Sequence, residues 1–390
     1  MWSHLLGRNR WPIGLDIGTD SIKMLQMCRV GGVITVRACR RWRFPVPADP
    51  DPRARRELAV GAVPDMLRRG GFRGNHVISS LSCGQLKIKN VRLPKLSGRE
   101  LERAVHGEAH DRFGGDFAPD QLHYLRAGEI RQGMESHQEY ILMGAPGEVV
   151  EDHYAMLREM GLYPEHIDVE PLAMFRPFER HLRRRADEEE VTVVVDLGHS
   201  STKVVVARGR EVVLVKKIDI GGRDFAQAVA DQLHLSYEEA EDLRFQIMRE
   251  RASHAREGQA GPDGEEEDPN SVRWTVLDAV RGQVEELARE VALCLRYCSV
   301  TFRGLRAKRV TMTGGQAYDP AMVRLLGEQL GVECVIGQPL RGVDTSGVDL
   351  GGDRRGMLAE WAVCAGLAFR PEESERGGRK RSHEADRLPA

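Results

Sequence analysis

The 390-residue sequence has no uninterrupted apolar run approaching the roughly 18 residues that a membrane-spanning helix requires. The apolar stretch between Met1 and Arg8 is too short for the hydrophobic region of a signal peptide. Net charge is also nearly absent, because 57 lysines and arginines face 59 aspartates and glutamates. This balance gives no basic excess for nucleic acid and none for a purely electrostatic hold on lipid. These absences predict a cytoplasmic protein, unless another molecule carries it to a membrane.

The sequence also lacks any CxxC pair, and its seven cysteines are odd in number and scattered. Cys294 and Cys298 stand four residues apart on an expected helix, but no second pair is spaced to complete a zinc site. We therefore expect reduced thiols rather than a disulfide framework.

What the sequence does contain is one pattern written twice, at residues 13–25 and again at 193–205. Each copy is an apolar run that ends in Asp, a glycine turn with small hydroxyl residues, and a second apolar run that carries a Lys. In each copy, apolar and polar residues alternate and glycines separate the runs. This pattern predicts a strand–turn–strand–turn–strand meander. A repeat this far apart predicts two similar domains rather than an array. The matching pairs are Asp16 with Asp196, Gly18 with Gly198, Ser21 with Ser201, and Lys23 with Lys203.

The rest of the chain reads as α/β. We expect strands at 77–81, 86–91, 140–145, 309–312 and 334–337, and helices following Ser97 and over 148–161, 224–233, 236–251, 276–302, 320–330 and 357–369. Ser97 with Glu100, and Ser236 with Glu239, predict capping boxes. The polar stretch 250–270 predicts a mobile loop, and the charged tail 371–390 predicts disorder.

The two Asp-x-Gly-x-x-Ser-x-Lys turns make chemical sense as two clamps on one polyphosphate. Glycine removes the Cβ that would block close approach, and hydroxyls and amides then cradle phosphate oxygens. Each Asp stands at a strand end, where a carboxylate holds hydrated Mg²⁺ through water. Either turn alone also fits an ordinary β-turn, and a strand lysine also fits an outward, solvated position. The pair in matching meanders favours the phosphate interpretation.

These paired turns resemble the two phosphate motifs of the actin-like ATPase superfamily. Residues 167–173 resemble its first connecting segment, which implies that Glu170 orients an attacking water. Residues 310–315 resemble the adenosine motif, and residues 362–368 resemble the second connecting segment, whose small residues let two helices cross at the hinge. Glu241 and Arg244 fall where relatives place an acidic–basic pair on the adenosine.

Within that superfamily the chain resembles the PilM family of type IV pilus assembly proteins. The likeness spans nearly the whole chain and rests on the phosphate turns together with residues 92–94, 100–109, 161–162, 168–171, 220–222 and 236–241. It implies an actin-like (ribonuclease H-like, duplicated) two-lobe ATPase fold with an inserted α/β subdomain. The implied boundaries are 11–83 plus 166–188 for the first lobe core, 84–165 for the insertion, 189–225 plus 308–370 for the second lobe core, and 226–307 for a helical subdomain.

The resemblance implies a site for ATP and Mg²⁺. Its phosphate- and nucleoside-binding residues would be Asp16, Gly18, Thr19, Ser21, Lys23, Asp196, Gly198, Ser200, Ser201, Thr202, Lys203, Gly221, Gly222, Glu241, Arg244, Gly314 and Gly315, with Asp16 and Asp196 holding Mg²⁺ through water. Two residues depart from the family pattern. Gln316 stands where a further glycine is usual, and His199 stands in the second turn, where it either contacts phosphate or leans into solvent.

The implied function is an ATP-binding scaffold that grips the short N-terminal tail of a bitopic, PilN-like inner-membrane protein, in a groove between the first lobe core and the insertion. A filament-forming relative of the cell-division type is an alternative, although the tail 371–390 has almost no apolar face. A small-molecule kinase is a further alternative, although residues 84–165 offer no convincing catalytic Asp. The sequence does not decide whether ATP is hydrolysed or whether the chain forms a homodimer. It also does not decide between a type IV pilus and a type II secretion system.

Overall fold

The computed structural model describes residues 11–45, 51–115, 117–118, 121–132, 135–254, 271–302, 306–350 and 358–369. Most of the loop expected at 250–270, from residue 255 on, and the tail expected at 371–390 lie outside the described residues. No described helix combines the length and the apolar character needed to cross a membrane.

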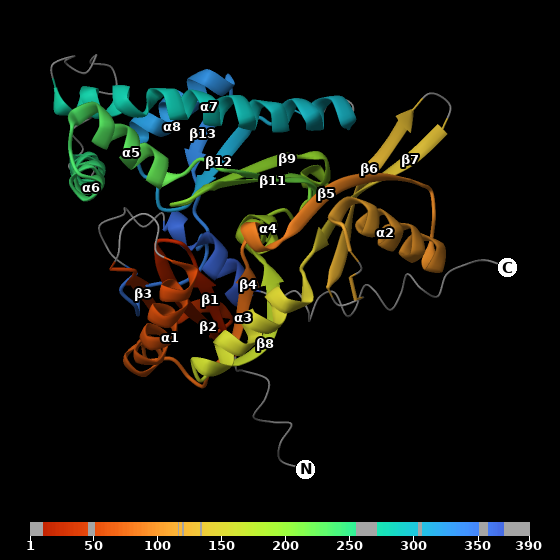
Figure 1. The fold of residues 1–390 in the computed structure, drawn as a ribbon, viewed down its shortest axis with the longest axis horizontal. Helices are drawn as coiled ribbons and strands as arrows, with labels where there is room; N and C mark the ends of the chain where they lie inside the picture. The colour runs from red at the N-terminus through yellow and green to blue at the C-terminus, as the bar shows by residue number, and fades with distance from the viewer. Residues whose placement is uncertain are drawn as a thin grey trace, which may run out of the picture.

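Two five-stranded sheets with the same strand order form the framework (Figure 1). The first is ordered β3-β2-β1-β4-β8 and the second β11-β10-β9-β12-β13. In each, two antiparallel hairpins are followed by two parallel strands, so the repeated meanders are confirmed. The strands are β1 (Ile13–Ile17), β2 (Ser21–Val30), β3 (Val33–Arg43), β4 (His76–Leu81), β8 (Tyr163–Val169), β9 (Val191–Leu197), β10 (Thr202–Arg208), β11 (Glu211–Ile218), β12 (Arg309–Thr313) and β13 (Glu333–Ile336).

Helices cover these sheets much as the periodicity predicts, but the helices at 52–69 and 170–179 were not expected and one predicted cap is wrong. The helices are α1 (Pro52–Arg69), α3 (Gly147–Glu159), α5 (Gly222–Leu233), α6 (Tyr237–His254), α7 (Val272–Thr301) and α8 (Pro320–Leu330). Helix α1 was not expected, because arginines crowd its first turns and leave a weak apolar stripe. Ser236 and Glu239 form the predicted capping box. Ser97 makes no side-chain cap bond, so the first capping box is wrong.

The inserted subdomain is a three-stranded sheet with one helix. It comprises β5 (Lys87–Pro94), α2 (Gly98–Phe113), β6 (Leu122–Gln132) and β7 (Glu135–Gly144), in sheet order β5-β7-β6. Strand β6 was not expected. Helix α3, which the expected boundary 84–165 includes, packs instead against α1 and β8. The insertion also packs on the second lobe, because Ala127, Ile141 and Met143 join the apolar core of that lobe.

Each lobe lends a helix to the other. Helix α4 (Glu170–Glu179) follows a strand of the first sheet, yet Ala173, Met174 and Phe175 are buried in the core of the second lobe. The last helix, over 362–369, follows the second sheet but packs on β2 and β3 of the first lobe. The segments expected as 166–188 and 308–370 each contain one of these exchanged helices, so each of the two segments packs on both lobes.

A buried histidine under α3 should make the fold sensitive to acid. The His153 side chain is 5% exposed, and its Nε2 lies 3.1 Å from Ser79 Oγ. Burial lowers the pKa of His153 from its ordinary 6.5 to about 4, so the unfolded chain takes up the proton first. Stability from this group is complete above pH 6.5 and is lost as pH falls toward 4.

We therefore expect the free energy of unfolding to fall by about 3 kcal/mol over that interval through His153 alone. His153→Gln, which keeps a hydrogen-bonding side chain but does not titrate, should remove this part of the slope. Urea unfolding at a series of pH values measures it. An unchanged slope in the variant would show that other groups cause the acid sensitivity.

Candidate functional site

The turn between β1 and β2 places a lysine–carboxylate pair at the carboxyl end of the first sheet. Asp16 and Lys23 are opposite each other in the hairpin register, and Lys23 Nζ lies 3.1 Å from Asp16 Oδ2. The Gly18 amide donates to the Ser21 carbonyl and closes the turn. Burial alone would lower the pKa of Lys23, but Asp16 raises it above its ordinary value, so the buried lysine is charged.

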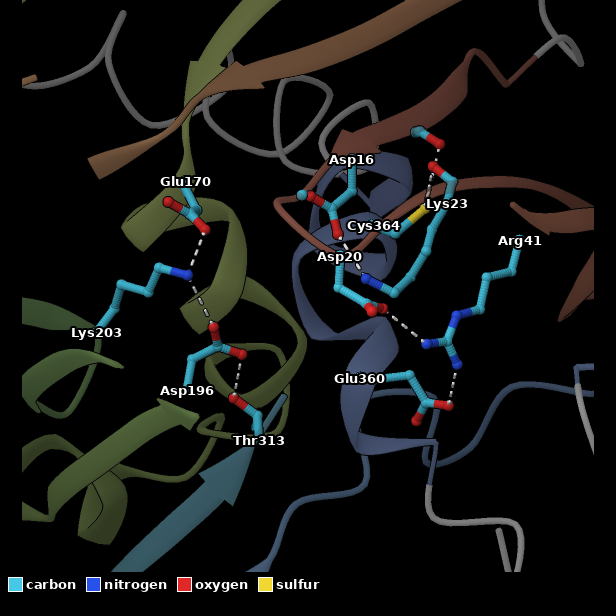
Figure 2. A network of polar contacts seen from close by, with 12 residues as sticks. Asp16, Asp20, Lys23, Arg41, Glu170, Asp196, Lys203, Thr313, Glu360 and Cys364 are labelled. Carbon is cyan, nitrogen blue, oxygen red and sulfur yellow. Dashed lines mark hydrogen bonds and ion pairs between the residues drawn. The ribbon is translucent and has the colours of Figure 1, made fainter. Parts of the chain in front are cut away.

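The turn between β9 and β10 repeats this geometry in the second lobe. Asp196 and Lys203 are paired in register, with Lys203 Nζ 3.3 Å from Asp196 Oδ2. Asp196 Oδ1 also accepts a hydrogen bond of 3.1 Å from the Thr313 hydroxyl. Figure 2 shows the two lysine–carboxylate groups on opposite sides of one cleft. The two turns therefore bring two cations and two carboxylates to one place, as the repeated motif predicts.

Glu170, the first residue of α4, makes the second lysine different from the first. Its Oε1 lies 2.9 Å from Lys203 Nζ, and its Oε2 accepts a hydrogen bond of 2.8 Å from the backbone amide of Cys83. Although burial opposes a charged lysine, Glu170 and Asp196 raise the pKa of Lys203 well above its ordinary value. Glu170 thus joins the second phosphate turn to the chain segment that leads into the insertion.

Glycines allow the backbone to pack tightly behind the second turn. A Cβ on Gly221 would lie 2.6 Å from the His199 carbonyl oxygen, and the Gly222 amide donates to the Gly198 carbonyl. Gly314 has φ +89°, and a Cβ there would lie 2.3 Å from the Leu197 carbonyl oxygen. These glycines therefore shape the cleft wall by close approach of backbone to backbone.

Gln316, the departure from the family pattern, has a structural partner. Its side-chain oxygen accepts a hydrogen bond of 3.0 Å from Arg244, which also donates to the Gly222 carbonyl. Arg244 is 5% exposed, and burial lowers its pKa. Arg244 therefore holds the start of α5 against the loop that carries Gln316, and its expected contact with a nucleoside stays a prediction.

Ion pairs join the two lobes beside the cleft. Arg43 of β3 lies 2.7 Å from Asp20 and 2.9 Å from Glu241 of α6, which belongs to the opposite lobe. Burial alone would raise the pKa of Asp20, but Arg43 and Arg41 bring it to about 2. His199 Nδ1 lies 3.8 Å from Glu241, and burial lowers the pKa of His199, so its ring turns to this cluster rather than to solvent.

The cleft is lined by many of the expected residues together with others from both lobes. Asp16, Gly18, Thr19, Ser21, Lys23, Glu170, Asp196, Gly198, Lys203, Gly314 and Gly315 line it. Seven expected residues do not: Ser200, Ser201, Thr202, Gly221, Gly222, Glu241 and Arg244. Thr202 is fully buried and its hydroxyl donates to the Ile220 carbonyl, which explains its exclusion.

Sequence reasoning missed several lining residues, namely Asp20, Arg41, Phe245, Glu360 and Val363. It assigned no ligand role to Gln316 and left the role of His199 open between phosphate contact and solvent. Asp20 lies inside the first turn motif, where its acidic side chain was a usable signal. Arg41 and Glu360 both line the cleft and lie 4.0 Å apart, although they are more than three hundred residues apart in the chain. A local sequence pattern cannot predict a contact between residues so far apart in the chain.

The residues present fit a magnesium-bound polyphosphate. Two buried lysines reach the cleft from opposite lobes, and each glycine turn keeps side-chain bulk away from it. Asp16 and Asp196, the expected Mg²⁺ residues, already accept hydrogen bonds from these lysines, so phosphate must compete with carboxylate for both cations. A second group in the described chain, Asp20, His199 and Glu241, brings three potential ligand atoms within 4.8 Å, but Arg43 already pairs with both of its carboxylates.

Comparison with solved structures gives a match to a PilM–PilN type IV pilus biogenesis complex, with a TM-score of 0.71, 23% identity, and coverage of 92% of this chain and 98% of that chain. The ethanolamine utilization protein EutJ from Carboxydothermus hydrogenoformans matches with a TM-score of 0.49 at 15% identity, covering 92% of this chain and 89% of that one. MreB 5 of Spiroplasma citri bound to AMPPNP matches with a TM-score of 0.48 at 12% identity, covering 95% and 98%. The first of these likenesses confirms the expected actin-like fold.

Comparison with protein families gives a match over residues 14–251 to the model described as type IV pilus assembly protein PilM. The matched range holds both phosphate turns, the whole insertion, Glu170 and the start of the helical subdomain. It covers more than half of the sequence. The chain therefore belongs to the PilM family of type IV pilus assembly proteins.

Proposed function

We propose that this protein is an ATP-binding scaffold of a type IV pilus inner-membrane assembly complex. One observation carries the proposal: two buried lysines, one from each lobe, reach a single cleft beside two strand-end aspartates. A polyphosphate between them would draw the lobes together, because each lobe supplies one clamp. Mg²⁺, when bound, would offset phosphate charge. Asp16 and Asp196 would hold its water ligands.

Binding would rearrange the ion pairs of the cleft. Lys23 and Lys203 would exchange carboxylate oxygens for phosphate oxygens, which are equally good acceptors for an ammonium group. Glu241 pairs with Arg43 beside the cleft, so it would have to leave that partner to reach a nucleoside hydroxyl. Glu170 would be released from Lys203 and become available to orient a water molecule if hydrolysis occurs.

The same exchange gives nucleotide a route to the insertion. Glu170 accepts its second hydrogen bond from Cys83, at the junction between β4 and β5. When Lys203 turns to phosphate, Glu170 loses the partner that fixes its carboxylate 2.9 Å away. The junction that carries the insertion then loses a fixed acceptor. A change in the cleft therefore alters the position from which the insertion begins.

Hydrogen bonds around the buried Glu139 hold the insertion on the second lobe. We call this group, Glu139 with Tyr297, Arg92 and Asn90, the polar seam. Glu139 of β7 is 1% exposed and accepts hydrogen bonds from Tyr297 of α7, from Arg92 at 3.0 Å and from Asn90 at 3.3 Å. The chain attaches the insertion to the first lobe, whereas this seam attaches it to the second. Lobe closure would therefore shift the insertion against the first lobe core.

The partner proposed for this surface is the short N-terminal tail of a bitopic, PilN-like inner-membrane protein, bound between the first lobe core and the insertion. The family and the fold shared with a PilM–PilN complex support this choice. Such a tail would hold the chain peripherally at the cytoplasmic face of the inner membrane. Nucleotide-tuned closure would set how tightly the tail is held.

Co-purification tests the scaffold function. The full chain is expressed with a bitopic partner whose cytoplasmic tail is intact, or with the same partner lacking the tail. We expect retention of the chain on the membrane-solubilised partner with the intact tail and no retention without it. Equal retention by both forms would contradict recognition of the tail.

Weakening the polar seam should reduce the effect of bound nucleotide on the affinity for the tail. Tyr297→Phe removes one donor to the buried Glu139 carboxylate, a bond to a charged group worth about 1.5–3 kcal/mol. We expect the ratio of tail affinities with and without ATP–Mg²⁺ to fall at least threefold, measured by fluorescence anisotropy of a labelled tail peptide. Tyr124→Phe, an exposed tyrosine on β6, is the matched control. Equal ratios in all three proteins would contradict the coupling.

A further inference from the structure

The edge of the first lobe that lies farthest from the nucleotide cleft is a distinct surface. The parallel strands β1, β4 and β8 end at the cleft, so all three begin at the opposite edge, where Ile13 pairs with Val77 and His76 with Tyr163. The hairpin between β2 and β3 turns at this same edge. We call the surface formed by Trp11 and residues 29–33, 68–76 and 158–165 the distal edge.

Side-chain hydrogen bonds join the segments of the distal edge into one platform. The Gln26 amide donates to the carbonyls of Trp11 at 3.0 Å and Arg73 at 2.9 Å, and its oxygen accepts from the Arg73 amide. Asn75 donates to the Gly161 carbonyl at 2.8 Å. These bonds hold the turns together, so the side chains above them share one surface.

Apolar side chains stand out of this platform. Val30 and Val33, at the tip of the hairpin, are 60% and 52% exposed, and Tyr163 is 48% exposed. They are three of the eight large apolar residues exposed in the described part of the chain. An exposed aliphatic tip and an exposed tyrosine at the same edge of a sheet are residues of the kind that insert at a membrane–water interface.

The charge of the distal edge is basic, unlike that of the whole chain. Five arginines belong to it, namely Arg29, Arg68, Arg69, Arg73 and Arg158. The carboxylates near them are Asp65, Glu159 and Glu165. Asp65 pairs with Arg68 and Arg69, Glu159 pairs with Arg56, and Glu165 pairs with His76. The ten residues that precede Trp11 hold Trp2, Leu5, Leu6, Arg8 and Arg10 and no acidic residue.

We propose that the distal edge docks onto the surface of an anionic phospholipid bilayer, with the hairpin tip and Tyr163 at the interface and the arginines against lipid phosphates. The near-zero net charge of the chain conceals this local excess. The docking would leave the cleft facing away from the bilayer, because the cleft lies at the other ends of the same strands. It goes beyond the proposed function and requires neither nucleotide nor the protein partner.

Sedimentation with vesicles tests the proposal on the full chain alone. The vesicles contain 30% phosphatidylglycerol in phosphatidylethanolamine, and pure phosphatidylcholine vesicles are the neutral comparison. We expect binding to the anionic vesicles that weakens as salt rises from about 0.05 to 0.5 M, since salt screens exposed charges. Arg68→Ala/Arg69→Ala/Arg73→Ala should lower the partition coefficient about 100-fold, and Val30→Ser/Val33→Ser about tenfold.

A matched control comes from the opposite end of the molecule. Helix α7 exposes Leu293 and Val300, 57% and 73%, together with Arg289 and Arg296. Replacing these four by serine or alanine should leave vesicle binding unchanged. Thermal unfolding of each variant confirms that it is folded. No binding to anionic vesicles, equal binding to neutral ones, or equal loss in the α7 variant would overturn the proposal.

Discussion

Replacing both Asp16 and Asp196 by alanine is expected to weaken binding of ATP–Mg²⁺ at least about 100-fold. Each carboxylate lies at a strand end in the cleft, where it would accept hydrogen bonds from water molecules bound to Mg²⁺. Hydrogen bonds to charged groups are worth about 1.5–3 kcal/mol each, so the loss of two gives an effect of this size. Isothermal titration calorimetry of ATP in excess Mg²⁺ measures it.

The same variant should treat Mg²⁺-free ATP differently. Lys23 loses its carboxylate partner in the variant and Lys203 loses one of two, so phosphate meets less competition for both cations. We expect binding of ATP in EDTA to be preserved or tightened. Asp65→Ala, at an exposed aspartate of α1, is the matched control and should bind both forms normally. Undiminished ATP–Mg²⁺ binding by the double variant would refute the site.

Replacing Gly366 by valine is expected to cost at least about 4 kcal/mol of unfolding free energy. Gly366 lies where the last helix crosses α4, and a Cβ there would lie 1.7 Å from the Ala173 carbonyl oxygen. That oxygen belongs to helix backbone, so it cannot move aside without separating the two helices. Because these helices are exchanged between the lobes, the variant should also lose ATP binding.

Gly282 of α7 provides the matched helix glycine, since a Cβ there would have no atom within 4 Å. Gly282→Ala should raise the unfolding free energy by about 0.5–1 kcal/mol, because alanine restricts the unfolded chain more than glycine does. Chemical denaturation of the three proteins gives both values. A Gly366→Val protein as stable as the parent would show that the helix crossing is looser than the geometry requires.

The elements that the sequence predicts well are those with a local signature. The two meanders repeat Asp, Gly, Ser and Lys at the same spacing, and strand alternation sets their hairpin register. The hairpin register then places Asp16 opposite Lys23 and Asp196 opposite Lys203, a pairing that was not predicted from the sequence. Gly366 was likewise expected at a close helix crossing, from the small residues of 362–368, and the crossing is there.

The features that sequence reasoning missed depend on contacts between distant segments. The hydrogen bonds of Arg244 to the Gly222 carbonyl and to the Gln316 side chain join segments that are far apart in the sequence. The ion pairs of Arg43 with Asp20 and Glu241 join two lobes and have no local pattern. The docking of the insertion on the second lobe through Glu139 is equally non-local. Such contacts follow from the packing of the lobes, which periodicity does not encode.

Nucleotide in the cleft is proposed to set how tightly the chain holds its partner's tail. The dissociation constant of a labelled tail peptide, measured for the full chain with ATP–Mg²⁺ and without nucleotide, tests this. We expect the two values to differ by about 5- to 150-fold, the usual range for coupled sites. Equal dissociation constants, measured with ATP bound to saturation, would contradict it.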